Sequence, residues 1–482
     1  MNFRAVFHLI SFLLFFTAIG KFASWLVSIA AGDSTEVQRG LLMAALLSTV
    51  ISTLLWALTR GTTDLSRRDG FGIVTFGWLA VAHLGTLPYL LTGAIPHAPT
   101  ALFEAMSGFT ATGATALREI EVLPDGVLFW RSLTQWNGGM GIIVLAVAII
   151  PFLGVGGMQL FSAEISGPSK DRLTPRIAST AKFLYGVYLL LTLVAILALR
   201  LAGMHWFDAI NHGLTCAATG GFSTYTGSIA HFESFRIELI CVTIMMLSAM
   251  SYPLHYRALM GRPGSYFRDA QWRFFIFVWL VAITIVSINL WRHMDLSGTL
   301  AVRQALFQVS TFITSTGYVS ADYDQWPALS RFVLLLLMVM GGCAGSTTGG
   351  IKAIRVFVLL KKGLREIRLF MRPEAVVQVK IGQKSIPQDI ISKVTSYFAI
   401  YMFIWAACTL LMTFFTPDLE TAFSSVLATL GNMGPGFGMV GAVQNYADIG
   451  SGGKIALTLL MLLGRLEFYT VLVLFLPAFW RR

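Results

Sequence analysis

Four short glycine-containing stretches decide the fold of this chain: Thr110-Ala111-Thr112-Gly113, Ala217-Ala218-Thr219-Gly220, Thr314-Ser315-Thr316-Gly317 and Asn432-Met433-Gly434-Pro435-Gly436. Each lies between two long apolar runs, and each has small hydroxyl or amide residues beside its glycine. One such stretch carries little information. Four in the same setting predict a ring of backbone carbonyls around one axis, the arrangement by which proteins replace the hydration shell of a small cation in a membrane.

The composition is typical of polytopic α-helical membrane proteins. Of the 482 residues, 56% are hydrophobic and 12% are charged, whereas about 25% of the residues of a soluble domain are charged. Many windows exceed the ~20 apolar residues that span a bilayer as a helix, and they lack the alternation of a transmembrane β-barrel. The cysteines have no metal-ligand spacing and are expected to be small buried residues: Cys216, Cys241, Cys343 and Cys408.

We expect about ten membrane spans, at roughly 5–31, 39–59, 71–92, 128–153, 178–202, 237–256, 272–292, 329–357, 390–415 and 454–480. The first is longer than the core of a signal peptide and is treated as retained. When the spans alternate, most of the 35 Lys and Arg fall on one side and most acidic residues on the other. The positive-inside rule then puts both termini in the cytoplasm. Topology thus explains most of the +11 net charge, which is no sign of nucleic acid binding.

From residue 71 onward one unit occurs four times: a span, a short descending segment, a glycine stretch and a second span. The descending segments, at about 98–110, 204–217, 299–313 and 418–430, are too short to cross a bilayer and suit half-helices that re-enter from the outer face. Each would point a helix C-terminus, with roughly half a negative charge, at the bilayer centre, where it favours a cation. The alternative is four glycine-rich connections without a common axis.

These residues resemble the superfamily of bacterial Trk and Ktr potassium transporters and the related fungal and plant (HKT) proteins, and most of all its TrkH-type pore subunits. The likeness covers nearly the whole chain. It implies an all-α membrane protein with four tandem helix–re-entrant pore loop–helix repeats around a central pore, preceded by two extra transmembrane helices. It also implies one selectivity filter in which backbone carbonyls hold K⁺ and the filter glycines are Gly113, Gly220, Gly317 and Gly434.

The filter residues implied by this resemblance are Thr110, Ala111, Thr112, Gly113, Ala217, Ala218, Thr219, Gly220, Thr314, Ser315, Thr316, Gly317, Asn432, Met433 and Gly434. The second stretch departs from the T-x-T-G pattern at Ala217, and the fourth departs further. Glycine at all four filter positions favours potassium and its near relatives over sodium.

A second glycine-rich run, 341–352, interrupts the eighth span. Five glycines within 341–350 disfavour a helix, since each costs about 1 kcal/mol relative to Ala. The run is either a kink with close helix packing or an unwound loop under the filter. The family has an intramembrane gating loop at this place, which implies that role for Gly341, Gly342, Gly345, Ser346, Thr347, Thr348, Gly349, Gly350 and Lys352.

Arg465 lies inside the last span, where a charge is costly. The family has an arginine here that contacts the gating loop, so the resemblance implies that Arg465 is part of the pore gate. Pairing with Glu467 is the alternative, although residues two apart on a helix do not face each other. Lys21, in the first span, is assigned no function, and His212 is expected to pack within its pore helix.

The basic segment 352–393 either fixes the topology or forms a docking surface, and 376–384 predicts a short hairpin with Gly382 near its turn. The family implies that a cytosolic TrkA-type nucleotide-binding regulatory subunit binds here. NAD or ATP/ADP would then be bound by that partner, with no cofactor in this chain. The resemblance further implies a homodimer among the lipids of a bacterial inner membrane.

The expected division of the chain is 1–70 for the two N-terminal helices, 71–155 for repeat 1, 156–262 for repeat 2, 263–360 for repeat 3 with the gating loop, 361–389 for the cytoplasmic linker and hairpin, and 390–482 for repeat 4. We expect a gated potassium-conducting pore subunit. The alternative is a secondary K⁺/H⁺ or K⁺/Na⁺ symporter, which would need intramembrane carboxylates, and Glu467 alone qualifies in the interior of the expected spans. A membrane enzyme is disfavoured, because the eight histidines are dispersed and form no catalytic motif.

Overall fold

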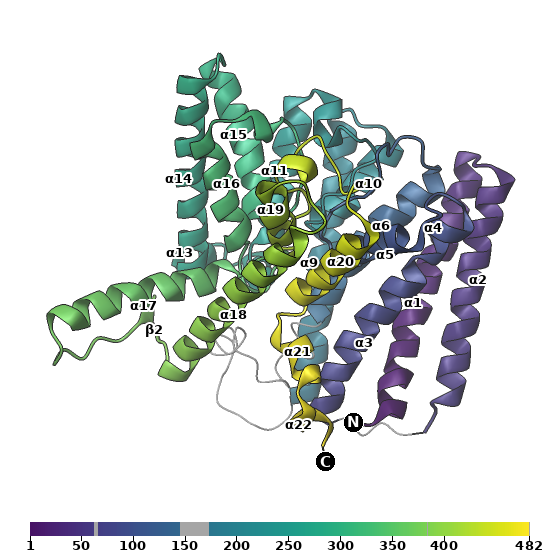
Figure 1. Ribbon diagram of the computed structural model, residues 1–482, viewed down its shortest axis with the longest axis horizontal. Helices are drawn as coiled ribbons and strands as arrows, with labels where there is room; N and C mark the ends of the chain where they lie inside the picture. Colours follow the sequence, from purple (N-terminus) through teal and green to yellow (C-terminus); the bar gives the residue numbers. More distant parts are fainter. Residues whose placement is uncertain (62–65, 145–172, 383, 482) are drawn as a thin grey trace.

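The structure is a computed structural model that describes residues 1–61, 66–144, 173–382 and 384–481. Within this part of the chain the architecture is helical, apart from the antiparallel pair β1 (Lys380–Ile381) and β2 (Lys384–Ser385). Both termini lie at the same end of the molecule (Figure 1). The end of the predicted span 128–153 and the predicted repeat boundary at 155/156 fall outside the described residues.

Six helices of the described part are long and apolar enough to cross a membrane. Two are N-terminal, and the others stand where the first span of each repeat is predicted. The six are α1 (Phe3–Ala31), α2 (Thr35–Leu58), α3 (Arg67–Gly85) continued by α4 (Leu87–Leu91), α9 (Leu173–Leu201), α14 (Ala270–His293) and α18 (Gln388–Met412). The predicted all-α polytopic fold is confirmed.

The second helices of the repeats are less regular: α6 (Asp125–Val144), α11 (Phe235–Ala249) followed by α12 (Tyr252–Leu259), α16 (Ala328–Met340), and α20 (Ser451–Arg465) followed by α21 (Tyr469–Leu472) and η5 (Val473–Phe475). The chain bends by 99° between α11 and α12 and by 109° after α20. The spans predicted at 237–256 and 454–480 are therefore each broken by a sharp bend. Pro253 cannot continue α11, because its ring would meet the carbonyl of Ala249. After α20, Glu467 and Phe468 have positive φ of 56° and 41°, which a right-handed helix excludes.

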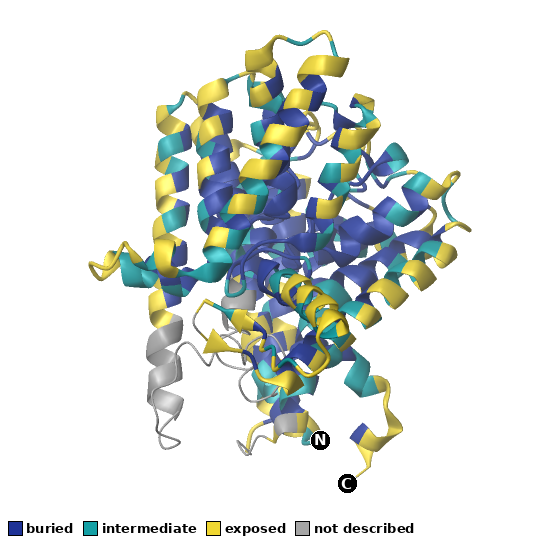
Figure 2. Ribbon diagram, turned by 90° about the vertical axis from the view of Figure 1, so that its left-hand side faces the viewer, coloured by how far each residue is buried: buried dark blue, intermediate teal, exposed yellow. Residues whose placement is uncertain are grey.

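Four shorter helices occupy the predicted descending segments: α5 (Ala98–Phe109), α10 (Trp206–Ala217), α15 (Gly298–Ile313) and α19 (Leu419–Leu430). Ser297 and Asp418 cap α15 and α19 by accepting the amides of Leu300 and Thr421. Buried residues gather at the centre of the molecule, whereas the surrounding helices expose their outward faces (Figure 2). The C-terminal turns of all four short helices are buried, so the loops that follow them begin in the interior.

Buried polar contacts fasten the two N-terminal helices to the first repeat. The Lys21 ammonium donates to the Ser48 hydroxyl at 2.5 Å and to the Leu84 carbonyl at 2.8 Å. The Asp33 carboxylate accepts the amides of Asp125 and Gly126 at 3.1 and 3.0 Å. Since these amides open α6, Asp33 acts as an N-terminal cap supplied by another element. Lys21 is thus a packing contact between helices.

Candidate ion filter and gate

Each of the four short helices ends in the same hydrogen-bonded turn. One residue with positive φ, between 49° and 53°, follows the helix in each case: Ala111, Thr219, Ser315 and Asn432. Its amide donates to the carbonyl three residues earlier, and the next amide donates to the carbonyl five residues earlier, at 2.8–2.9 Å. These are the two bonds of a Schellman motif. The four loops are therefore structurally equivalent although their sequences have diverged.

This equivalence corrects the register that the sequence predicts for the second loop. Two residues after the first positive φ, a glycine has positive φ in every loop: Gly113, Gly221, Gly317 and Gly434, with φ of 83°, 80°, 85° and 98°. Gly220 therefore corresponds to Thr112, and its predicted equivalence with Gly113 is wrong by one residue. The T-x-T-G pattern aligns Thr219 with Thr112, whereas by its positive φ Thr219 corresponds to Ala111. Glycine is required where φ is positive, at Gly221. Ala217 still belongs to α10.

The four loops meet in a closed ring. A Cβ atom built on the positive-φ glycine of each loop would collide with a carbonyl oxygen of the next loop. The pairs are Gly113 with Gly220 at 2.1 Å, Gly221 with Thr316 at 1.9 Å, Gly317 with Met433 at 2.2 Å, and Gly434 with Thr112 at 2.7 Å. Each oxygen belongs to the residue that precedes the glycine of its own loop. The cycle runs through loops 1, 2, 3, 4 and back to 1, so the loops surround one axis.

Side chains of the loops fasten this ring. The Thr110 and Thr112 hydroxyls lie 2.6 Å apart, and the corresponding hydroxyls of Thr314 and Thr316 lie 2.8 Å apart. The Asn432 amide donates to the Thr112 hydroxyl at 3.0 Å and so joins loop 4 to loop 1. The small polar residues of the sequence pattern thus hold the loops to themselves and to each other.

A cavity of about 70 Å³ opens above the ring, and all four loops contribute to its wall. Gly113, Gly221, Gly317 and Pro435 line it, together with Arg131. Near its rim, the Glu121 carboxylate accepts the amide and the hydroxyl of Thr226 at 2.7 and 2.6 Å. Desolvation opposes ionisation there, but hydrogen bonds from Thr226 and from the Ile120 amide outweigh it and lower the pKa of Glu121. The sequence predicts that the loops enter from the outer face, so this space is called the outer cavity.

Each short helix also forms hydrogen bonds with the extended segment that follows its own loop. The Glu104 carboxylate accepts the Ala116 amide at 3.1 Å, and the His212 ring bonds the Ser223 hydroxyl at 2.9 Å. The Gln308 amide donates to the Ala321 carbonyl at 3.3 Å, and the Ser424 hydroxyl bonds Phe437 at 3.0 Å. His212 has the packing role expected of it. Glu104 and its partner Arg131 are functional candidates that the sequence interpretation missed, although a charge in a re-entrant helix is a signal for one.

The run 341–352 is an unwound loop that lies directly against the ends of the short helices. The Gly349 amide donates to the Ser315 hydroxyl at 2.7 Å, and the Thr219 hydroxyl bonds that of Thr347 at 3.1 Å. A Cβ atom on Gly349 would lie 2.0 Å from the Gly431 carbonyl oxygen. The loop therefore touches loops 2, 3 and 4 on the side opposite the outer cavity. Of the two interpretations of this run, the structure has the unwound loop.

The remaining residues of the run hold its shape. Gly341, Gly345 and Gly350 have positive φ of 67°, 74° and 76°. The Ser346 hydroxyl lies 2.8 Å from that of Thr348, and a Cβ on Gly342 would meet Thr348 at 2.7 Å. Lys352 ends the run with a φ of 79°, and its ammonium donates to the Thr348 carbonyl. Only glycine tolerates most of these turns, which explains why the run is rich in it.

Arg465, the last residue of α20, connects the run to the first repeat. Its guanidinium donates to the Thr347 carbonyl and to the Gly138 carbonyl, both at 2.9 Å, and its side chain is buried. Glu467 instead pairs with Arg355 at 2.6 Å. The alternative pairing of Arg465 with Glu467 is therefore wrong. A buried cation bridges two backbone carbonyls of different repeats at the inner side of the ring.

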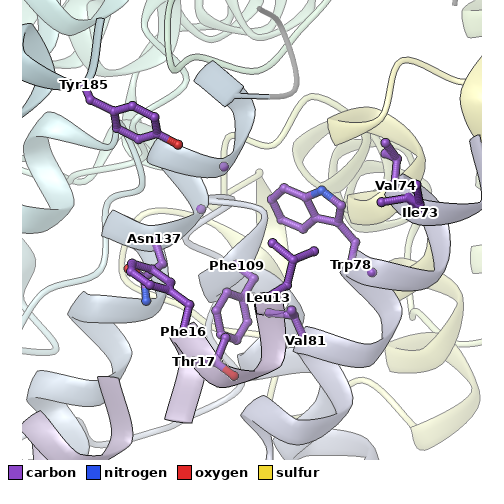
Figure 3. A pocket seen from close by; sticks show the side chains of 13 residues that line it. Leu13, Phe16, Thr17, Ile73, Val74, Trp78, Val81, Phe109, Asn137 and Tyr185 are labelled. Atoms are coloured by element: carbon purple, nitrogen blue, oxygen red, sulfur yellow. The ribbon is translucent and has the colours of Figure 1, made fainter. Parts of the chain in front are cut away.

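A larger cavity of about 340 Å³ lies among α1, α3, α5, α6 and α9. Leu13, Trp78 and Phe109 point into it, and Asn137 is one of its few polar side chains (Figure 3). Such a wall offers no set of oxygen ligands to replace the hydration shell of a cation. The ring, rather than the larger cavity, is the candidate ion site.

Known proteins resemble this chain over its full length. A family model named TrkH and described as a cation transport protein matches residues 38–482. The Trk system potassium uptake proteins TrkH of Halomonas elongata and Escherichia coli K12 are 41% and 40% identical, each over 100% of both chains. The crystal structure of the potassium transporter TrkH from Vibrio parahaemolyticus superposes with a TM-score of 0.92 at 36% identity, covering 100% of each chain.

Proposed function

Because the chain belongs to the TrkH family of cation transport proteins, we propose that it is the potassium-conducting pore subunit of a Trk-type uptake system. The observation that carries the proposal is the closed ring in which each loop's glycine abuts the next loop's carbonyl. Such a ring supplies oxygen ligands from one polypeptide. The relatives are transport proteins, so the chain is no enzyme.

The filter consists of the four loops, with K⁺ held by their backbone carbonyls. In each loop the sign of φ alternates from residue to residue, which turns successive carbonyls toward one side of the strand. The helix ends behind the loops add about half a negative charge each. K⁺ enters from the outer cavity, loses water to the carbonyls and is not held by any side-chain charge. We propose this role for the filter residues predicted above except Ala217, which belongs to α10, and we add Gly221 as the glycine equivalent to Gly113.

The run 341–352 and Arg465 form the gate. In this arrangement the run lies across the inner side of the ring, and Arg465 holds Thr347 there. A cation leaving the filter would meet the run and a buried guanidinium, so we assign this arrangement to the closed pore. Opening requires the run to move away from Ser315 and Gly431. Once open, the membrane potential drives uptake with about 2.3 kcal/mol per charge per 100 mV.

Symport of K⁺ with H⁺ or Na⁺ is less well supported than channel-type conduction. A proton-coupled carrier needs carboxylates that release and accept protons within the membrane. Glu104 and Glu467 are both held by arginines, at 2.8 and 2.6 Å. Carboxylates engaged in this way hold two helical elements together and are not presented to a proton donor or acceptor. Proton uptake strictly proportional to K⁺ uptake would reverse this preference.

The helix α17 (Ala353–Met371), which leads away from the gate, supports a homodimer. Exposed apolar residues repeat along it at spacings of four and three: Leu360, Leu364, Ile367 and Met371. Such a stripe on a helix that projects from the body (Figure 1) suits a second copy of the same helix. The dimer would lie among lipids in the bacterial inner membrane, with both termini cytoplasmic.

The basic surface beside this stripe is the proposed docking site of a TrkA-type subunit, which would carry any NAD or ATP/ADP. Lys361, Lys362, Arg365 and Arg368 lie on α17, and Lys380 and Lys384 lie on the hairpin that follows. Gly382 has a φ of 58° at its turn, as the sequence predicts. We further propose the repeat boundaries given by the sequence as the limits of the four units.

Uptake of ⁸⁶Rb⁺ into liposomes that contain the purified protein tests the function. Wild type should take up Rb⁺ in preference to ²²Na⁺ when the gate is open. Serine at Gly113, Gly221, Gly317 or Gly434 should reduce the preference, because a side chain there displaces the neighbouring carbonyl. Equal uptake of both ions by wild type and all variants would refute the filter.

A further inference from the structure

The second filter loop lacks the internal support that loops 1 and 3 have. Ala218 and Gly220 stand where loop 1 has Thr110 and Thr112, so the hydroxyl pair that measures 2.6 Å in loop 1 is absent. Loop 2 nevertheless has the same turn and the same φ values as the others. Another part of the molecule must supply the missing contacts.

Gln135 of α6 supplies them from behind the loop. Its side-chain amide donates to the Gly220 carbonyl at 2.7 Å, and its side-chain oxygen accepts the Phe222 amide at 3.0 Å. A Cβ atom on Gly220 would lie 2.4 Å from the Gln135 carboxamide carbon. Glycine is therefore required at these two adjacent positions for different reasons. Gly221 permits a positive φ, whereas Gly220 leaves room for Gln135.

One turn earlier on the same face of α6, Arg131 extends this contact to the first loop. Its guanidinium donates two bonds to Glu104, at 2.9 and 2.8 Å, and one to the Ser223 carbonyl at 3.2 Å. It also lies 4.2 Å from the centre of the Phe222 ring. Glu104 in turn holds the Thr115 hydroxyl and the Ala116 amide. Glu104, Arg131 and Gln135 are buried.

The buried contacts that join the other neighbouring loops are made by neutral groups, and the ion pair of Arg118 with Asp448, between the segments after loops 1 and 4, is exposed. Tyr318 bonds the Thr215 hydroxyl at 2.5 Å, and Tyr323 bonds the Gly436 carbonyl at 2.9 Å. Asn432 joins loop 4 to loop 1. The contact between loops 1 and 2 thus differs from the others in containing a buried ion pair, which is strong only while every member keeps its partners.

From these contacts we propose that Glu104, Arg131 and Gln135 form a clamp that positions the second filter strand and thereby determines selectivity for K⁺ over Na⁺. The three residues touch no ion. They act through the Gly220 carbonyl and the two strands behind the ring, so they are positioning residues. The inference rests on the proposed filter function and assigns to α6 a part in it.

The test compares Gln135→Met and Arg131→Gln with wild type in liposomes. Gln135→Met keeps the side-chain length but removes the donor and the acceptor, and it leaves the ion pair intact. The measurements are the ratio of ⁸⁶Rb⁺ to ²²Na⁺ uptake and the reversal potential with K⁺ and Na⁺ on opposite sides. We expect both variants to lower the ratio several-fold and to shift the reversal potential toward zero, with Gln135→Met keeping the unfolding temperature close to wild type.

Arg303→Gln is the matched control. Arg303 on α15 pairs with Glu238 on α11 at 2.8 Å, so it too joins a short helix to its neighbour, but the pair touches no filter strand. It should leave the ratio unchanged. An unchanged ratio in Gln135→Met with selective wild type overturns the clamp alone. Wild type without preference for Rb⁺ overturns the proposed function and the clamp together.

Discussion

Gly221 shows why the proposed filter needs glycine. Its φ of 80° is a conformation that side chains rarely adopt, and a Cβ atom there would lie 1.9 Å from the Thr316 carbonyl oxygen. Both the local backbone and the neighbouring loop therefore exclude a side chain. The same two conditions hold at Gly113, Gly317 and Gly434, which is why four glycines persist among loops that otherwise differ.

Gly221→Ala should abolish the preference of the protein for Rb⁺ over Na⁺, because even one methyl group must push the Thr316 carbonyl aside. The measurement is the uptake ratio in liposomes. Gly186→Ala in α9 is the control, since a Cβ there meets nothing within 4 Å. A Gly221→Ala protein as selective as wild type would contradict the assigned register.

Arg465→Gln should raise basal Rb⁺ uptake several-fold in the absence of any partner protein. The guanidinium donates to the Thr347 carbonyl of the proposed gating loop and to the Gly138 carbonyl of α6, and glutamine is too short to reach both. Time courses of uptake into liposomes give the basal rate. Arg60→Gln controls for loss of a positive charge, since Arg60 stacks on Trp56 at the end of α2. Basal uptake equal to wild type would remove Arg465 from the gate.

At the scale of elements, α6 begins with a cap that it does not itself contain. Asp33, in the connection between α1 and α2, accepts the first amides of α6. The connection between α1 and α2 therefore stabilises α6, the helix whose Gln135 holds the second loop of the ring. This contact gives the two extra N-terminal helices a structural role in positioning α6, which their own sequences do not indicate.

Asp33→Ala should lower the free energy of unfolding by about 1 kcal/mol, the usual value of a helix N-cap, while leaving ion selectivity unchanged. Thermal unfolding in detergent, followed by size-exclusion chromatography, measures the loss. Glu36→Ala, in the first turn of α2, removes a nearby carboxylate without removing the cap. If both variants unfold at the same temperature as wild type, the cap contributes nothing.

At the scale of the whole molecule, the exposed stripe of α17 predicts the oligomeric state. Leu364→Glu combined with Ile367→Glu should convert the proposed dimer into monomers, because the new carboxylates of the two copies would face and repel each other. Light scattering with size-exclusion chromatography reports the mass. Val376→Glu, at an exposed position outside the stripe, is the control and should leave the dimer intact. A dimer that survives the double change would place the interface elsewhere.

The sequence alone predicts the large features of this molecule and misses its local ones. Apolar runs and glycine spacing predict the helices and the four descending segments because both follow from membrane thickness. The register of the second loop is mispredicted, because Thr219-Gly220 matches the T-G motif and only the positive φ identifies Gly221 as the equivalent glycine. The ion pair of Arg131 with Glu104 is not predicted, because it joins two helices that are separated in the sequence. The bend after Arg465 depends on positive φ at Glu467 and Phe468. Neither residue is a glycine, so the local sequence does not predict it.

The central claim is that the four loops together hold one K⁺ by their backbone carbonyls. A crystal of the full-length protein grown with Tl⁺ in place of K⁺ tests it directly, because anomalous scattering locates the ion. We expect a peak on the axis enclosed by Thr112, Gly220, Thr316 and Met433, within contact distance of carbonyls from all four loops. Tl⁺ bound only elsewhere, or beside a single loop, would contradict it.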